Sequence, residues 1–225
     1  MNHIILITII LLVAINTYGF AYSYLITAKS FFKRKKIQSK NMNLDILKNR
    51  TPLVLFNVSI LILINSLGLY FFKDYYIKDY SSIIITVFEV MFILIIDDMF
   101  FYFFHRIMHE NKLIYRTIHK IHHRANTPIP IDYIYVHPLE WSSGMIGPFI
   151  GMLVIGGISI YSFWIYLIIR NFHEIHIHSG IKSSILHKLM PFYGNNEHHD
   201  VHHAKRDGNY ASTFDFWDLV FKTKI

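Results

Sequence analysis

Histidine is concentrated in three short runs, and these constrain the fold more than any other feature of the sequence. The first run has the spacing HxxxH and the other two have HxxHH; they begin at His105, His119 and His199. Side chains three or four residues apart share one face of a helix, so each run is predicted to present its imidazoles as one cluster. Of the 15 histidines, all but His3 lie after residue 104.

So many histidines predict a metal site rather than a set of structural histidines. A buried imidazole needs hydrogen-bond partners or a metal ion, and a chain of 225 residues offers few partners for this many rings. A single zinc site uses three or four protein ligands, so eight or more imidazoles suit two metal ions. Imidazole binds zinc, copper, iron and nickel alike, and the ligand type alone leaves the element open.

The composition predicts a membrane protein. Hydrophobic residues make up 53% of the chain and charged residues only 16%, with a mean hydropathy of +0.33. A chain this apolar is unlike an ordinary soluble domain. The sequence contains no cysteine, which excludes disulfides, a thiolate nucleophile, iron–sulfur clusters and thiolate-bound haem.

The positive charge is concentrated in one loop. The formal net charge is +7, and residues 29–50 contain eight Lys or Arg against the single acidic residue Asp45. This loop lies between two apolar stretches. We therefore interpret it as a cytoplasmic loop that follows the positive-inside rule, and not as a nucleic-acid-binding region.

Apolar stretches predict three straight membrane spans. The first is expected at residues 3–26, as a retained anchor rather than a cleaved signal peptide. The second is expected at 53–72, with Pro52 at the first helical position, where proline is favoured. The third is expected from 83 to about 104. The basic loop between the first two spans places the N-terminus outside.

A fourth apolar stretch, residues 142–172, predicts a hairpin. Gly156 and Gly157 lie near its middle and divide it into two short pieces. A hairpin returns the chain to the cytoplasmic face and keeps the later histidines beside the earlier ones, whereas one straight span would separate them. The predicted fold is an all-α integral membrane protein with about four transmembrane helices and a cytosolic histidine-rich cap.

Outside the three runs, four other polar residues are candidates for the site. Asp98 lies two helical turns before His105, where it could orient that ring or simply be solvated near the headgroups. His137 could be a further ligand or a structural hydrogen bonder. His178 is the best candidate after the hairpin, with Glu174 four residues before it on the same face. His173 and His176 lie on neighbouring faces of the same segment, and His187 is predicted to be isolated from the site.

The residues around these histidines resemble motifs of the fatty acid hydroxylase/sterol desaturase superfamily of membrane-bound non-haem di-iron oxygenases. Residues 102–109 resemble its FYWxHRxxH, 137–140 its HPxE, 178–180 its HSG, and 199–218 its HDxHH, GNY and fWD motifs. The resemblance extends over roughly 85–225, which is therefore expected to be the catalytic domain. Residues 1–84 are expected to form membrane anchor helices with the basic loop.

This resemblance implies a centre of two iron ions, with zinc possible in purified protein. The implied ligands are His105, His109, His119, His122, His123, His178, His199, His202 and His203. In the fatty acid hydroxylases a further histidine lies four residues before the one that matches His178. Glu174 occupies that position here and becomes a candidate ligand or a neighbour of one. The family's FGT near the end is Phe221-Lys222-Thr223 here.

The implied reaction uses O2 and external electrons to hydroxylate or desaturate an unactivated C–H bond of a lipid, sterol or similar hydrophobic substrate. The sequence contains no fused cytochrome b5 domain, so the electrons are expected from a separate cytochrome b5-like or ferredoxin-like protein with its reductase. The endoplasmic reticulum and the bacterial inner membrane are both compatible with the sequence.

Two other functions are compatible with the same residues. A metal-ion binding or transport protein also uses histidine clusters, but its ligands are expected inside the spans, and the predicted spans contain no histidine except His3 at one edge. A catalytically inactive family member is the other alternative. The complete set of nine histidines argues against it.

Overall fold

The computed structural model describes residues 2–40, 43–78, 82–183 and 193–225, and it is mostly helical. The α-helices are α1 (Asn2–Ala28), α2 (Leu44–Tyr76), α3 (Ile83–Glu110), α4 (Lys112–Thr117), α5 (Pro138–Gly144), α6 (Ile146–Val154), α7 (Ile160–Ile177), α9 (Asn196–Lys205) and α10 (Phe216–Val220). The shorter elements are the 3-10 helices η1 (Ser30–Lys35), η2 (His119–Arg124) and η3 (Pro130–Ile134) and the strands β1 (Ile77–Lys78) and β2 (Ile158–Ser159).

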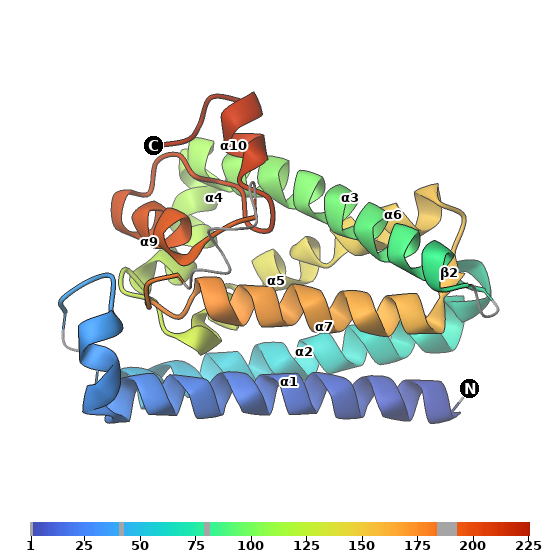
Figure 1. Cartoon of the computed structure of the whole chain (residues 1–225), viewed down its shortest axis with the longest axis horizontal. Helices are drawn as coiled ribbons and strands as arrows, with labels where there is room; N and C mark the ends of the chain where they lie inside the picture. The colour runs from blue at the N-terminus through green and yellow to red at the C-terminus, as the bar shows by residue number, and fades with distance from the viewer. Residues whose placement is uncertain (1, 41–42, 79–81, 184–192) are drawn as a thin grey trace.

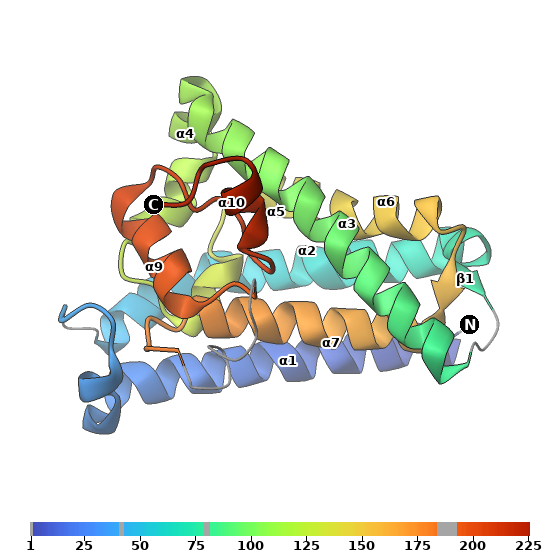
Figure 2. The same cartoon turned by 45° about the horizontal axis from the view of Figure 1, so that its top comes forward.

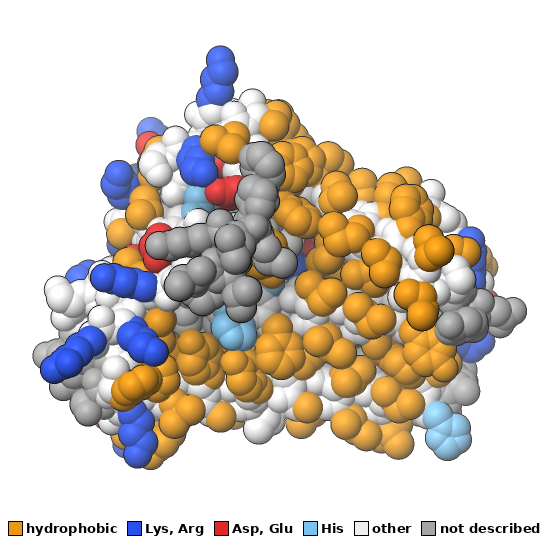
Figure 3. Space-filling view, viewed as in Figure 1, with side chains coloured by type: hydrophobic (Ala, Val, Ile, Leu, Met, Phe, Trp, Pro, Cys, Tyr) orange, Lys and Arg blue, Asp and Glu red, His pale blue; other side chains and the backbone are white. Residues whose placement is uncertain are grey.

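The long helices form a bundle with the histidine runs at one end. Helices α1, α2 and α7 lie side by side along the long axis, and α3 crosses them obliquely (Figures 1 and 2). Helices α1, from His3 onward, and α2 are long and apolar enough to cross a membrane. Hydrophobic side chains cover most of the visible face over α1, α7 and α3 (Figure 3). The prediction of a mostly helical fold is thus confirmed, and α1 and α2 are candidate membrane helices at two of the predicted positions.

The chain reverses at the two glycines that predicted a hairpin. Gly156 and Gly157 have φ angles of +76° and +94°, a region that side-chain-bearing residues rarely adopt, and they join α6 to β2 and α7. Strand β2 pairs in parallel with β1, Ile77 opposite Ile158, so the reversal is fixed against the end of α2. Helix α7 therefore returns toward the end of the molecule that carries α9 (Figure 1).

Helix α2 begins earlier than predicted, and Pro52 lies inside it. The helix starts at Leu44, with the Asn43 side chain accepting a hydrogen bond from the backbone N–H of Ile46. Proline usually disrupts a helix interior because it lacks an N–H and its ring clashes with the preceding turn. Here the turn before the proline is held by a tertiary contact, since Arg50 forms an ion pair with the buried Asp132 of η3.

A hydrophobic core holds η3, which follows η2 in the chain, in place. Ile131 and Ile134 of η3 are buried against Ile15 of α1 and Ile175 of α7. The Asn57 side chain of α2 donates hydrogen bonds to the carbonyl oxygens of residues 134 and 136, at 2.9 Å each. These contacts tie the loop that follows η2 to three long helices. They therefore give the histidines of η2 a rigid support.

Candidate metal centre

The nine histidines converge at one end of the bundle and form two adjacent clusters. Within each cluster the candidate ligand nitrogens all lie within 4.8 Å of one another. The five-histidine cluster consists of His105, His109, His119, His123 and His202, and the four-histidine cluster consists of His122, His178, His199 and His203. The two clusters adjoin, because the rings of His123 and His203 are 5.1 Å apart between centroids.

Each HxxHH run is divided between the clusters, contrary to the prediction that a run faces a single one. His119 and His123 belong to the five-histidine cluster and His122 to the other. In the last run the assignment is reversed, because His202 alone belongs to the five-histidine cluster. Consecutive residues of a helix point about 100° apart, or about 120° in a 3-10 helix, so two adjacent histidines cannot reach one ion.

The five-histidine cluster draws its rings from three elements, α3, η2 and α9. The Nε2 atoms of His109, His119 and His123 form a triangle with sides of 2.8, 3.0 and 3.1 Å. The Nε2 atom of His105 is 3.2 Å from that of His119. The ring of His202 is 4.5 Å from that of His105 between centroids. All of these rings except His109 are buried.

The four-histidine cluster is assembled from η2, the end of α7 and α9. The Nε2 atom of His199 lies 2.9 Å from that of His178 and 3.1 Å from that of His203. The ring of His122 is 4.6 Å from that of His203 between centroids. All four side chains are buried. This cluster depends on the reversal at the hairpin, because only that reversal brings His178 to α9.

Hydrogen bonds to backbone carbonyls fix which nitrogen of several rings carries the proton. The Nδ1 atoms of His105, His178 and His202 donate to the carbonyl oxygens of residues 210, 174 and 208, at 2.8, 2.8 and 2.9 Å. A carbonyl only accepts, so Nδ1 carries hydrogen and Nε2 presents a free lone pair to the cluster. Nε2 of His202 is buried and has no hydrogen-bond partner in the described part of the chain.

These lone pairs fit metal ions better than they fit one another. Unprotonated nitrogens about 3 Å apart repel each other unless a cation lies between them, and a buried polar atom without a partner is costly. Burial also lowers the pKa of His122, His199 and His203 well below the ordinary value of 6.5, so these rings are neutral at neutral pH. Neutral imidazole is the form that binds a metal. The donor set therefore suits two ions.

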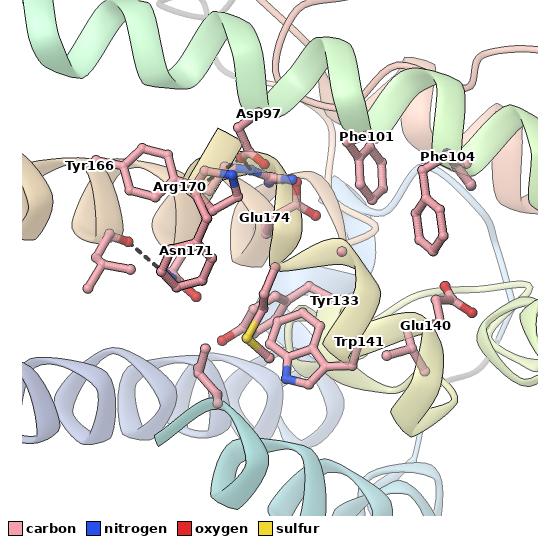
Figure 4. Close-up of a pocket in the computed structure, with 18 of the residues that line it drawn as sticks. Asp97, Phe101, Phe104, Tyr133, Glu140, Trp141, Tyr166, Arg170, Asn171 and Glu174 are labelled. Atoms are coloured by element: carbon pink, nitrogen blue, oxygen red, sulfur yellow. Dashed lines mark hydrogen bonds and ion pairs between the residues drawn. The ribbon is translucent and has the colours of Figure 1, made fainter. Parts of the chain in front are cut away.

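A cavity adjoins both clusters and extends into the apolar part of the bundle. Its empty volume is about 1040 Å³, including its open mouth, and five cluster histidines contribute to its wall. One part of the wall is polar, where Arg170 lies between the carboxylates of Asp97 and Glu174, and the aromatic rings of Phe101 and Phe104 come from the same helix as Asp97 and lie next to it (Figure 4). Other wall residues, such as Leu61, Met152 and Phe163, are apolar, so the cavity can hold an apolar molecule.

The sequence model of a family described as fatty acid hydroxylase matches residues 90–223. The chain belongs to the fatty acid hydroxylase family. Methylsterol monooxygenase 1 of Rattus norvegicus is 40% identical over 133 residues, covering 58% of this chain and 44% of the relative. A methylsterol monooxygenase of Aspergillus fumigatus is 32% identical over 150 residues, covering 64% and 50%.

A third relative covers more of the chain. The very-long-chain aldehyde decarbonylase GL1-8 of Oryza sativa subsp. indica is 29% identical over 215 residues, which is 89% of this chain and 77% of the relative. By contrast, the chain spans about half the length of the methylsterol monooxygenases that it matches. No solved structure matches the chain.

In the residues that match the family's HPxE motif, the glutamate contacts a cluster histidine and the histidine does not. His137 caps α5 by accepting the backbone N–H of Leu139 at 3.1 Å, and it belongs to neither cluster. Pro138 occupies the first helical position, where it is favoured. These two residues orient Glu140, whose Oε1 lies 2.9 Å from Nδ1 of His119. Of the two roles considered for His137, the structure shows that of a structural hydrogen bonder, whereas Glu140 was not predicted.

Asp98 does not orient a histidine, which corrects the second candidate. Its two carboxylate oxygens accept the backbone N–H groups of Thr213 and Phe214, at 2.7 and 2.8 Å. Nδ1 of His105 instead donates to the carbonyl of Tyr210. Asp98 therefore holds the segment after the last histidine run against α3. It acts on the five-histidine cluster only through this segment.

Glu174, which replaces the usual family histidine, lies beside the four-histidine cluster and outside its ligand set. Its side chain accepts hydrogen bonds from Arg170 and from the Ser212 hydroxyl, and its Oε2 is 3.7 Å from Nδ1 of His178. Nearby, His173 lies 3.1 Å from the carbonyl of Ser212 and is in neither cluster. His187 lies outside the described residues.

Proposed function

We propose that this protein is a membrane-bound di-iron oxygenase that hydroxylates or desaturates an unactivated C–H bond of a lipid, sterol or similar hydrophobic substrate. The observation that carries the proposal is the convergence of nine mostly buried imidazoles into two adjacent clusters beside an apolar cavity. The proposed ligands are the nine histidines of these clusters. We favour iron because the family resemblance implies a di-iron centre.

The reaction has a simple balance for hydroxylation. A substrate C–H, O2, two electrons and two protons give a C–OH and water; removal of a second hydrogen gives an alkene instead. When bound, the two irons would supply the activation of O2. The chain supplies the rest: carbonyl oxygens and Glu140 fix the proton on Nδ1 of their histidines, and the cavity holds the substrate carbon near the clusters and away from bulk water.

The proposed membrane arrangement has four spans, with α1, α2, α3 and the α6–α7 hairpin within the bilayer. Residues 1–84 serve as anchor helices with the basic loop, and residues 85–225 as the catalytic domain. The basic loop and the histidine clusters lie at the same end of the bundle, which the positive-inside rule assigns to the cytosol. The endoplasmic reticulum and the bacterial inner membrane both fit this arrangement.

The substrate is proposed to be long and mostly apolar, with one oxygen-containing group. The relatives' names refer to methylsterols and to very-long-chain aldehydes, and both classes have this character. The cavity supports the same choice, because its wall is largely apolar but includes a polar part near the clusters. Methylsterols and long-chain alcohols and aldehydes are the first compounds to test.

Iron analysis of detergent-purified protein from iron-supplemented cells tests the proposal. About two irons per chain are expected, one for each cluster. His122→Ala should lose iron and product formation, whereas the control His3→Ala should keep both, because His3 is exposed and belongs to neither cluster. One iron or none in the wild type would contradict the proposal. Robust iron or zinc flux into liposomes would support the transport alternative instead.

A further inference from the structure

The metal centre has one side toward the cavity and another toward the protein surface. The cavity wall includes His105 and His119 of the five-histidine cluster, but not His109. His109 is the only one of the nine cluster histidines that is not fully buried. Its ring lies beside Tyr115 and Tyr210, at centroid distances of 5.5 and 5.2 Å, and it hydrogen-bonds the backbone of Arg206. His109 thus connects the cluster with a part of the surface outside the cavity wall.

Exposed cations lie on the segments that contact His109. They come from the segments directly adjoining His109 in sequence or in space, namely α4, η2 and the end of α9. The exposed basic residues are Lys112, Arg116, Lys120, Arg124, Lys205 and Arg206. None of these six forms a salt bridge within the described residues, whereas Arg106 nearby is paired with Glu110. We call these six residues together with His109 the His109 rim.

Against the six cations of the His109 rim, two exposed acidic residues lie close to it in sequence, Glu110 and Asp207. The rim therefore has a strong net positive charge. Most of the Lys and Arg side chains visible in Figure 3 lie at the end of the molecule that carries α4 and α9. The positive-inside rule accounts for basic residues on the cytosolic side in general. It does not account for their position around the one exposed edge of a metal cluster.

We infer that the His109 rim is the docking surface of an acidic one-electron carrier protein, which reduces the metal centre through the His109 edge. This inference rests on the proposed function, because that reaction needs two electrons per O2. The carrier is oxidised twice in successive encounters, and the centre takes up one electron each time. Substrate then enters from the cavity side while the carrier docks on the other side.

The chemistry of the rim fits such a partner. Complementary charge raises the association rate of two proteins by about 10-fold to 1,000-fold and suits small, transient redox complexes, which must dissociate after each transfer. Two exposed apolar residues, Ile107 and Leu113, border the cations. An apolar patch within a polar rim is the common pattern of a protein interface.

Anaerobic stopped-flow mixing tests the inference without any substrate. Iron-loaded protein is mixed with a pre-reduced soluble cytochrome b5 domain or a pre-reduced [2Fe–2S] ferredoxin, both acidic, and oxidation of the carrier is followed by absorbance. Lys112→Glu combined with Arg116→Glu should lower the second-order rate constant at least about 10-fold and weaken its dependence on salt. The corresponding Gln pair should give an intermediate loss.

Arg34→Glu combined with Lys35→Glu is the matched control. It makes the same change of charge on exposed side chains of η1, and its rate constant should stay within about 2-fold of the wild type. Iron content must be equal in all variants. Equal losses in the two Glu pairs, or no electron transfer to the wild type from either carrier, would overturn the inference.

Two further measurements separate other outcomes. Protein that is reduced with dithionite and then freed of excess dithionite should consume O2 in every variant, and a failure of this in iron-loaded wild type would count against the proposed function and not against docking alone. Flotation with vesicles that contain phosphatidylserine tests an anionic lipid surface as the occupant. If the Lys112/Arg116 Glu pair lost vesicle binding and kept its electron-transfer rate, the rim would be a lipid contact and the inference would be wrong.

Discussion

The two histidine clusters differ in ligand number, exposure and surroundings. The five-histidine cluster has one ring at the surface and a carboxylate, Glu140, behind His119. The four-histidine cluster is fully buried, and its neighbouring carboxylate, Glu174, is shared with Arg170 and Ser212. Three of its four histidines contribute to the cavity wall, against two of five in the other cluster.

This difference indicates a division of labour. A catalytic metal needs a free coordination position, and a smaller ligand set beside the cavity leaves one available. A metal with five imidazoles has fewer free positions, and its exposed His109 edge suits electron entry. We therefore expect the four-histidine cluster to control the reaction with substrate and the five-histidine cluster to control reduction.

Removing one ligand from each cluster tests this division most strongly. His122 and His123 are adjacent in sequence but belong to different clusters. We expect His122→Ala to leave three imidazoles in its cluster, to lose about one iron and to lower product formation about 100-fold or more. His123→Ala leaves four imidazoles and should retain more iron. Iron per chain and turnover of both variants measure the contrast, and identical iron loss would remove the basis for distinguishing the clusters.

Acidification should weaken both clusters. Burial lowers the pKa of His202, in the five-histidine cluster, to about 4, and it also lowers the pKa of His178, in the four-histidine cluster. Because these pKa values are lower in the folded protein, the unfolded state binds more protons below about pH 6.5. The contribution of these histidines to the stability of the metal-free protein is therefore fully present above this pH and is lost as the pH falls.

The size of this effect can be measured by thermal unfolding. Each such histidine contributes a slope of up to about 1.4 kcal/mol per pH unit below about pH 6.5. We expect metal-free protein to unfold at a clearly lower temperature at about pH 5.5 than at about pH 7.5. An unfolding temperature that does not fall between these two pH values would contradict the prediction.

The carboxylates behind the clusters should give smaller, cluster-specific effects. Glu140→Gln keeps the shape of the side chain but removes the charge that faces Nδ1 of His119. We expect a loss of about 10-fold to 100-fold in metal affinity at the five-histidine cluster. Glu174→Gln removes the negative charge between Arg170 and His178 and should act at the four-histidine cluster. Competition with a graded series of chelators measures both, and the reverse assignment would contradict the structure.

The sequence allowed all nine cluster histidines to be predicted because their spacing and flanking motifs are local features. The division of each run between two clusters was not predictable in the same way, because it depends on where α3, η2, the end of α7 and α9 meet. Asp98 illustrates the same limit. Its place on α3 suggested a contact with His105, but its partners are backbone amides 115 and 116 residues later in the chain.

The role of His137 and the start of α2 differ in how far the sequence indicates them. A histidine directly before a proline at a helix start is well placed to cap that helix, which favours the structural role of the two considered for His137. Proline favours a first turn, and this predicts a start of α2 at Pro52, later than the observed one. The Arg50–Asp132 ion pair, which holds the preceding turn helical, joins residues far apart in sequence and leaves no local signal.

The smallest expected effect concerns the C-terminal segment that supports the five-histidine cluster. Lys222 has a φ of +56°, in the left-handed region, and it stands where the family's FGT motif has glycine. Glycine adopts this conformation without the steric cost of a Cβ, so Lys222→Gly should raise the free energy of unfolding by about 0.5–1 kcal/mol.

The segment is linked to the five-histidine cluster by backbone hydrogen bonds. The carbonyl of Thr223, the residue after Lys222, accepts the N–H of Asn209. Asn209 precedes Tyr210, whose carbonyl accepts a hydrogen bond from His105. Chemical denaturation of the metal-free protein measures the gain. Because the segment reaches the carbonyl partner of His105, any accompanying gain in metal affinity should be larger at the five-histidine cluster, and an equal gain at both clusters would contradict this expectation.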